Sequence, residues 1–285
     1  MQAGILTDQA WVDWDKNGTP DLLVVGHWSS PQLYLNNGSQ LVYSTPSEWA
    51  ELKGLWNSIE LQDLDGNGTP EVLLGNWGLN SKWQVNADQP LRLYRSDFDK
   101  NGSVEPLITY YLQGTETPFS SKDDLVKQMP FLNKKFLSYE DFASASMEEL
   151  FGKEALAQAE VLQVNELRSG TLRKKGESGW NFEAWPQLAQ SSPVFDVYSE
   201  ATNGELAIYL VGNLHQISTQ LGRLDAQHGL ILRLNNQTNS WVVDKTPWTS
   251  GAARQIARLN SNKDTYYLVG INNGPLQVFR NSTGE

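Results

Sequence analysis

The chain has 285 residues, of which 39% are hydrophobic and none is Cys. This length can bury one large core or two ordinary ones, and the absence of Cys excludes a disulfide scaffold, a thiolate zinc site and a Cys nucleophile. The net charge of −11 argues against nucleic acid as a partner, and no apolar run approaches the roughly 18 residues that membrane insertion requires.

Three segments in the first part of the chain share one spacing of oxygen-bearing side chains. Each has Asp at positions 1 and 3, Asn at 5, Gly at 6 and Asp or Glu at 9. Alternate residues of a curled loop can direct their oxygens to one centre, and Ca²⁺ takes about six to eight oxygen ligands. The backbone carbonyl at position 7 can supply one more. The predicted ligands are Asp13, Asp15, Asn17, Thr19 and Asp21; Asp63, Asp65, Asn67, Thr69 and Glu71; and Asp97, Asp99, Asn101, Ser103 and Glu105.

These loops differ from an EF-hand, which needs Glu at position 12 and flanking helices. Position 12 is Val24, Leu74 or Ile108, and a short apolar run typical of a strand follows each loop. The alternative is a plain turn, because Asp, Asn and Gly favour turns. Three copies, and the repulsion among their carboxylates without a cation, favour metal. The expected cofactor is up to three structural Ca²⁺ ions.

A repeat emerges when the loops are used as anchors. A strand ending in Gly, a short polar-aromatic stretch and a second strand follow the first two loops, and two later copies lack the acidic loop. The predicted strand pairs are 22–26 with 32–38, 72–75 with 91–94, 208–212 with 230–236, and 266–270 with 276–281, with edge strands at 41–43 and 241–243. The second unit is short, so its outer strand is either absent or supplied by another part of the chain.

The third copy is interrupted by a segment of different character. Its loop and first strand run to Tyr111, and its outer strands are expected at 170–176 and 180–185. Residues 115–165 carry apolar side chains at three- and four-residue spacing and are rich in Ala, Glu, Lys and Leu. This pattern predicts a helical insertion within the third blade unit.

Repeats of about 40–60 residues with three or four strands are typical of a β-propeller. We therefore predict an all-β fold, a β-propeller of about five recognisable blade units in one domain over residues 1–285, with a helical insertion. Five units could close a ring. The start of the chain in mid-repeat also fits a fragment of a larger ring, and hence part of a longer multi-repeat chain.

The loop motif followed by an apolar strand resembles the FG-GAP/VCBS repeat, the calcium-binding unit of integrin-α-type propellers and of many bacterial surface and secreted proteins. Residues 55–279 resemble bacterial VCBS-repeat proteins, notably in Gly75-Asn-Trp-Gly-Leu-Asn-Ser81, 90–94, 127–136 and 222–226. The resemblance implies that the acidic loops bind the metal and that the module is extracellular, at the cell surface or periplasmic. It implies little about the ligand.

Candidate ligand-binding residues lie outside the acidic loops. A converging His pair could bind a ligand or act as a base, an Arg–Asp pair could clamp a sugar, and exposed Trp could stack on one. The alternatives are ordinary loop residues, an internal ion pair and core packing. The candidates are His27, Trp28, Trp77, His215, Arg223 and Asp225.

Three classes of function remain open. The first is a calcium-stabilised, non-catalytic adhesion or binding module for a glycan or a surface protein. The second is a propeller enzyme acting on polysaccharide, such as a lyase, and the third is a purely architectural domain. No acid–base set or nucleophile motif stands out, so the sequence favours binding over catalysis and predicts no catalytic residue.

Overall fold

The computed structural model describes residues 4–176, 179–202, 205–235, 238, 240–261 and 264–281. The chain divides into two compact units, unit 1 comprising Met1–Lys82 and Leu167–Glu285, and unit 2 comprising Trp83–Glu166. The sequence predicts one domain over 1–285 with a helical insertion at 115–165. The structure differs in that the inserted unit begins before its helices and includes the third acidic loop.

Unit 1 contains four antiparallel sheets among its described residues. Sheet I has the strand order β1-β2-β3-β4 with β5 paired to β2, sheet II has β13-β12-β7-β6, sheet III has β14-β15-β16-β17, and sheet IV has β18-β19-β20. The strands are β1 Ile5–Val12, β2 Asp21–Ser29, β3 Gln32–Asn36, β4 Leu41–Tyr43, β5 Gly54–Leu55, β6 Ser58–Gln62, β7 Glu71–Gly75, β12 Gly170–Lys174, β13 Trp180–Ala184, β14 Val194–Thr202, β15 Glu205–Gly212, β16 Leu230–Asn235, β17 Ser240–Asp244, β18 Ala253–Asn260, β19 Thr265–Ile271 and β20 Gln277–Asn281. The helix α1 (Ser47–Ala50) and the 3₁₀ turn η1 (Gln187–Gln190) complete unit 1.

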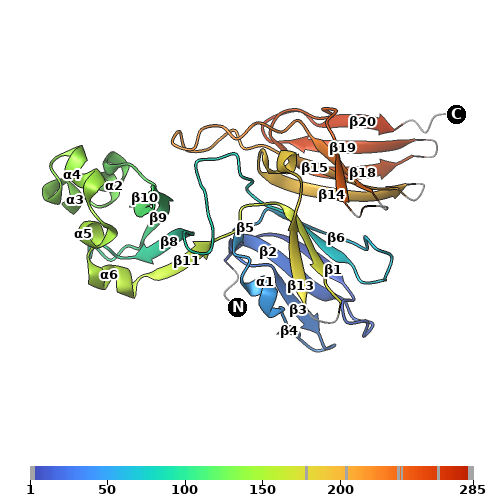
Figure 1. Ribbon diagram of the computed structural model, residues 1–285, viewed down its shortest axis with the longest axis horizontal. Helices are drawn as coiled ribbons and strands as arrows, with labels where there is room; N and C mark the ends of the chain where they lie inside the picture. The colour runs from blue at the N-terminus through green and yellow to red at the C-terminus, as the bar shows by residue number, and fades with distance from the viewer. Residues whose placement is uncertain are drawn as a thin grey trace. The chain divides into compact units, whose positions relative to one another are not determined.

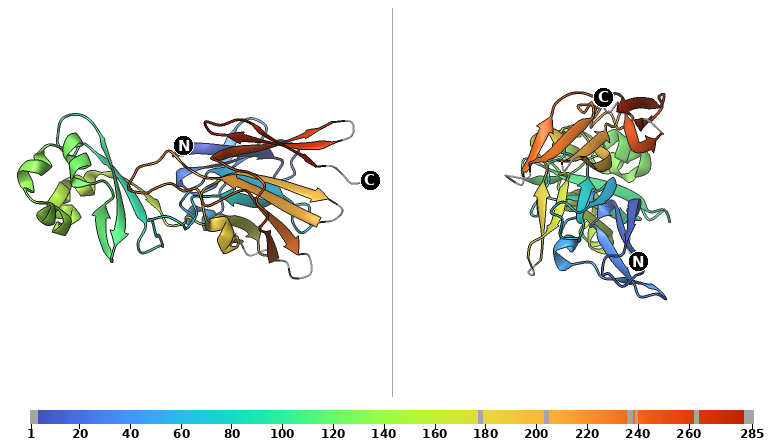
Figure 2. Two further views of the ribbon diagram at one scale, coloured as in Figure 1. Left: turned by 90° about the horizontal axis from the view of Figure 1, so that it is seen from above. Right: turned by 90° about the vertical axis from the view of Figure 1, so that its right-hand side faces the viewer.

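The first strand of each sheet packs against the first strand of the next, with β1 on β6, β6 on β14 and β14 on β18. Across unit 1 the colours of Figures 1 and 2 therefore pass from blue in sheet I to red in sheet IV. This succession of blades confirms the predicted all-β, propeller-like fold with a small helical insertion. Asn236, at the end of the predicted strand 230–236, lies outside the described residues.

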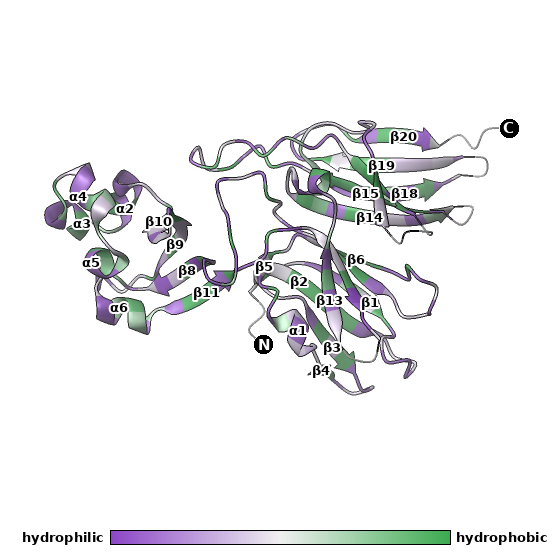
Figure 3. Cartoon of the chain, viewed as in Figure 1, coloured by the Kyte–Doolittle hydropathy of each residue, from purple (hydrophilic) through white to green (hydrophobic). Residues whose placement is uncertain are grey.

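The cores of unit 1 lie between successive sheets. Leu23 and Val25 of sheet I pack with Val72 and Leu74 of sheet II, and a second core joins sheets II and III. A third core contains Val211, Ala253, Ile256 and Val269, from sheets III and IV. Strands such as β1 accordingly carry both hydrophobic and hydrophilic segments (Figure 3), because alternate residues face opposite sides of a sheet.

The predicted outer strands of the third copy belong instead to the second. Strand β12 pairs antiparallel with β7 through Gly170 opposite Leu74, and β13 pairs with β12. That assignment to the third copy was wrong, because strand pairing is non-local and unit 2 is inserted between β7 and β12. The predicted pairing of 72–75 with 91–94 was wrong for the same reason, since Leu91–Ser96 pairs with Glu105–Leu112 and Glu160–Val164 within unit 2. The other reading of the short second unit, an outer strand supplied by a distant part of the chain, is confirmed.

Unit 2 is a four-stranded sheet covered by short helices. The sheet has the order β10-β9-β8-β11, and Leu125, Met129, Leu132 and Leu150 are buried in its core. Its elements are β8 Leu91–Ser96, β9 Glu105–Leu112, β10 Thr115–Pro118, α2 Lys122–Gln128, α3 Phe131–Lys135, α4 Tyr139–Ser144, α5 Met147–Phe151, α6 Lys153–Gln158 and β11 Glu160–Val164. Among the described residues no helix has the length and apolarity needed to cross a bilayer.

Two Gly residues near the end of a second strand, Gly26 and Gly212, are required by close backbone contact. A Cβ at Gly26 would lie 2.2 Å from the carbonyl oxygen of Ile5, and one at Gly212 would lie 1.7 Å from that of Pro193. Both distances are far below contact, so only Gly allows the neighbouring first strand to approach here.

Candidate metal centres

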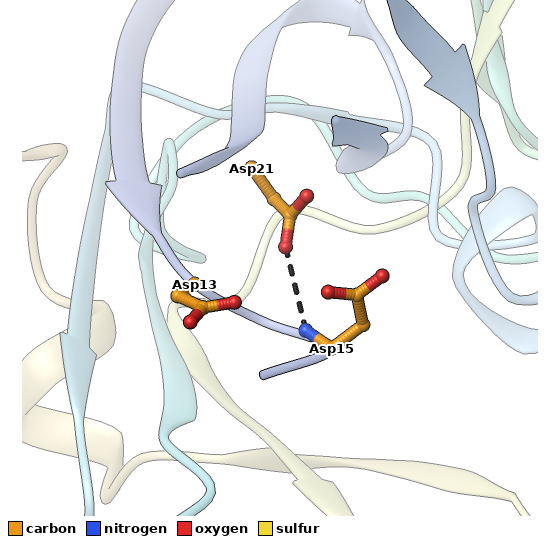
Figure 4. Close-up of side chains that lie close together, drawn as sticks. All are labelled: Asp13, Asp15 and Asp21. Atoms are coloured by element: carbon orange, nitrogen blue, oxygen red, sulfur yellow. Dashed lines mark hydrogen bonds between the residues drawn. The ribbon is translucent and has the colours of Figure 1, made fainter. Parts of the chain in front are cut away.

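Each acidic loop connects two paired strands at a hairpin. The loops join β1 to β2 and β6 to β7 in unit 1, and β8 to β9 in unit 2. In each loop the carboxylates at positions 1, 3 and 9 offer oxygens that all lie within 4.8 Å of one another. Figure 4 shows Asp13, Asp15 and Asp21 around one such space. The predicted strand after each loop is therefore confirmed, and each loop also follows a strand.

The three loops share the same backbone bends. Position 4 is left-handed in every loop, with φ of 61° at Lys16, 73° at Gly66 and 61° at Lys100. Position 6 is also left-handed, and Gly occupies it each time, with φ of 86°, 80° and 89°. A side chain is strained in this region, so Gly at position 6 keeps the loop curled.

The same hydrogen bonds recur in each loop. At position 1 a carboxylate oxygen accepts the N–H of the Gly at position 6, at 3.0, 2.8 and 2.9 Å. The position-3 carboxylate accepts the N–H of position 5 at 3.1 Å in all three. The position-9 carboxylate accepts the N–H of position 2 at 2.7, 2.7 and 2.9 Å. The loops are therefore shaped by their own carboxylates as well as by any cation.

The carboxylate at position 9 is buried in all three loops. Asp21, Glu71 and Glu105 are 0%, 2% and 6% exposed, whereas the acids at positions 1 and 3 are exposed or half-buried. Asp21 also accepts the N–H of Asn36 at 2.6 Å, which ties the first loop to the end of β3. The sequence indicates Asn36 only as part of the predicted strand 32–38.

The electrostatics of the second loop match a cation site. Burial raises the pKa of Glu71, and Asp65 and Asp63 raise it further, against the lowering effects of the Leu64 N–H and Arg173. A bound cation would favour the charged carboxylates. All the side-chain donors are oxygens, the donor set that hard cations such as Ca²⁺ and Mg²⁺ prefer. The acidic clusters can thus hold a metal ion.

Position 7 supports the turn through its N–H group. The N–H groups of Thr19, Thr69 and Ser103 donate to the Asn carbonyl at position 5, at 2.8, 2.7 and 2.7 Å. The Thr19 hydroxyl also donates to the carbonyl of Asn36 at 2.7 Å. A metal contact from these residues stays a prediction.

Two of the candidate ligand residues, His27 and Trp77, form hydrogen bonds with neighbouring side chains. His27 contacts Asn57 through Nε2 at 3.0 Å, and the residue at the same place in sheet II, Asn76, is fully buried. Trp77 is 8% exposed, and its Nε1 donates to the Ser81 hydroxyl at 3.3 Å. Trp77 therefore presents little surface for stacking, whereas Trp28 is half-buried at the end of β2.

His215, Arg223 and Asp225 lie in the connection between β15 and β16. Arg223 and Asp225 pair at 3.4 Å, with side chains 61% and 48% exposed, as the ion-pair alternative predicts. A backbone bridge between Leu214 and Leu224 closes this connection. In the described part of the chain no hydrogen bond joins His27 to His215, and a shared site for these candidates stays a prediction.

Comparison with known proteins identifies one matching segment. Residues 13–74, which hold the first two acidic loops and strands β2 to β7, match the model of the FG-GAP-like repeat. No curated protein matches the chain. The matching segment contains two of the three loops whose geometry is described above. The chain therefore contains an FG-GAP-like repeat over residues 13–74.

Proposed function

We propose that the chain is a calcium-stabilised binding module of the bacterial VCBS-repeat type, which recognises a glycan or a surface protein without catalysis. The observation that carries the proposal is one acidic loop built three times with the same bends and hydrogen bonds. The FG-GAP-like repeat indicates a propeller-type binding module. Calcium, the hard cation most tolerant of irregular oxygen cages, suits the donor set best.

The role of calcium is structural. Each ion would lie where two paired strands meet and would offset the repulsion among three carboxylates. At roughly 2 mM calcium and a dissociation constant near 0.1 mM, linkage stabilises the folded state by about 1.8 kcal/mol per site. Three sites contribute about 5 kcal/mol, comparable with the net stability of a domain.

Weak calcium sites support a location where calcium is abundant. Extracellular calcium modules have dissociation constants of about 10⁻⁴ to 10⁻³ M, so such loops would be empty in the cytosol. The module is accordingly assigned to the extracellular space, the cell surface or the periplasm. Its membership in a longer multi-repeat chain is supported by the outward faces of the two end sheets, where Trp11 and Leu259 are each 53% exposed.

Calorimetry with calcium chloride tests the metal assignment. We expect three sites and a higher melting temperature in calcium than in EDTA. Asp65→Asn, in the second loop, should remove one site, whereas the matched control Asp88→Asn, an exposed acid outside the loops, should remove none. Absence of binding heat together with unchanged melting in EDTA would overturn the proposal.

A glycan array run beside a polysaccharide lyase assay, each with calcium and with EDTA, tests the ligand assignment. Binding that requires calcium and proceeds without turnover supports a binding module. Release of unsaturated sugar products would replace that role with a lyase. Capture of surface proteins but of no glycan would select the protein ligand.

A further inference from the structure

A cavity of about 560 Å³ opens between sheets III and IV of unit 1. Its walls come from β14, β15, β16, β19 and β20 and from the connection that follows β17. The volume lies in the range of pockets that hold small molecules, about 300–1,000 Å³. It is separate from the acidic loops and from the ligand candidates that the sequence suggests.

One part of the cavity wall is aromatic. The rings of Tyr209 and Tyr267 stack with centroids 5.3 Å apart, and Trp248 meets Tyr209 edge-on at 5.8 Å and Phe279 at 5.5 Å. Two backbone hydrogen bonds to the carbonyl of His228, both 3.1 Å long, fix the start of the Trp248 segment. These contacts make a preformed apolar surface that is half-buried except at Tyr267, which is buried.

Charged side chains of both signs complete the wall. Glu200 accepts a hydrogen bond from the Tyr267 hydroxyl and pairs with Arg258 at 3.1 Å, so it is held in place. Arg233 and Arg280 pair with Asp244 and Asp264 at 3.7 and 2.8 Å, and their side chains remain 46% and 60% exposed.

The lining therefore offers hydrogen-bond donors and acceptors beside an apolar surface. Glu200 and Glu205 can accept hydrogen bonds, and Arg233 and Arg280 can donate them. The two signs are balanced, and both Arg side chains already have acidic partners. This balance disfavours a strongly anionic ligand. A sugar ring meets all these conditions, since its C–H face is apolar and each hydroxyl both donates and accepts.

We propose that this inter-sheet cavity binds a neutral pyranose ring, with the ring's apolar face on the aromatic wall and its hydroxyls on Glu205 and Arg280. The inference rests on the proposed binding role and narrows its ligand to a neutral glycan.

Saturation-transfer NMR with methyl glycosides of glucose, galactose and mannose tests the assignment. At least one of these glycosides should bind the full chain, and sodium glucuronate should bind more weakly. Glu205→Gln and Arg280→Gln should each weaken binding at least fivefold, because each removes a charged hydrogen-bond partner.

Matched controls come from unit 2. Glu154→Gln replaces an exposed Glu, and Arg95→Gln replaces a 49% exposed Arg that pairs with Glu160 at 2.7 Å, much as Arg280 pairs with Asp264. Both control variants should bind like the parent chain. The inference is overturned if no glycoside binds, if glucuronate is preferred, or if both cavity variants bind like the parent.

Calcium binding separates this inference from the proposed function. If calcium raises the melting temperature but no glycoside binds, the cavity assignment alone fails. If a glycoside binds through the cavity but calcium has no effect, the calcium assignment alone fails.

Discussion

Replacing Asp21 with Ala is expected to destabilise unit 1 even when calcium is absent. Asp21 is fully buried, and its carboxylate accepts the N–H groups of Trp14 at 2.7 Å and Asn36 at 2.6 Å. A third, longer bond comes from Asp15 at 3.4 Å. The carboxylate thus joins the loop to β3 without any metal.

The magnitude follows from the two shorter bonds. A donor that loses its partner costs about 1–3 kcal/mol when it is buried away from water. Two such donors would cost about 4 kcal/mol, and relief of the buried charge offsets part of this. We therefore expect Asp21→Ala to lower the free energy of unfolding by about 3 kcal/mol in EDTA.

Urea unfolding in EDTA, followed by Trp fluorescence, measures this loss. Only Trp83 of the eleven Trp residues lies in unit 2, so the signal reports mainly on unit 1. The matched control is Asp15→Ala, because Asp15 is exposed. Among the described contacts its carboxylate accepts hydrogen bonds only from Asn17, a residue of the same loop.

The two variants should differ in EDTA but agree in their response to calcium. Asp15→Ala should lie within about 0.5 kcal/mol of the parent in EDTA, as surface substitutions usually do. Both variants should lose the calcium stabilisation of the first loop. Equal stability of the two variants in EDTA would refute the role assigned to position 9.

Three further predictions concern pH, the inserted unit and the third loop. Burial raises the pKa of Asp196 to about 7, and the charge of Asp8 adds to it. The neutral acid is thus favoured in the folded state, so the free energy of unfolding should fall by up to about 4 kcal/mol as pH rises from about 4 to about 7. Asp196→Asn should make the free energy of unfolding depend less on pH, as measured by urea titrations at constant calcium. An unchanged pH dependence in this variant would contradict the prediction. Replacing residues 83–166 by a short Gly-Ser linker should leave unit 1 cooperatively folded by Trp fluorescence, because β7 pairs directly with β12; loss of cooperativity would show that unit 1 needs the insert. Glu105→Ala should destabilise unit 2 by about 1–2 kcal/mol in EDTA, since one N–H bond from Phe98 is lost. Hydrogen exchange of the β8 and β9 amides measures this loss, and unchanged protection of these amides would contradict the prediction.

The acidic loops were predictable because their information is local. Asp13 and Asp21 lie within one loop, so their spacing along the chain largely determines their spacing in space. The strand at Gly170–Lys174 was predicted from the sequence as part of 170–176, but its partner was not. Pairing with β7 crosses the whole of unit 2, and no local pattern specifies a partner at that distance.

The burial of individual side chains could also not be predicted from the local sequence pattern. Trp77 follows a Gly and an Asn, a context that resembles an exposed loop. It is buried because its segment returns to the rest of unit 1, where the N–H of Gly78 donates to the Leu167 carbonyl at 2.7 Å. Likewise, Tyr209 lies in β15 of sheet III and Tyr267 in β19 of sheet IV, and nothing in the sequence indicates that the two rings stack and line a cavity.

Carboxylates join the sheets of unit 1 in a second way that needs no cation. Asp8, near the start of β1, accepts the N–H of Ile59 in sheet II at 2.9 Å, and Asp196 of sheet III accepts that of Ile256 in sheet IV at 2.7 Å. Both acids follow a register shift in the first strand of their sheet, so that Asp8 lies opposite Val25 and Asp196 opposite Val211, each one residue before the closely approached Gly.

Two different kinds of contact therefore stabilise the two ends of β1. Asp8 lies near the beginning of the strand and bonds to the neighbouring sheet, whereas the acidic loop begins at Asp13, just beyond its end. A chelator acts only on the loop, because the bond from Asp8 has a backbone N–H as its donor. Removal of calcium should therefore loosen the hairpin ends first and leave the sheets packed through their first strands, so that a calcium-free state of unit 1 is weakened rather than unfolded.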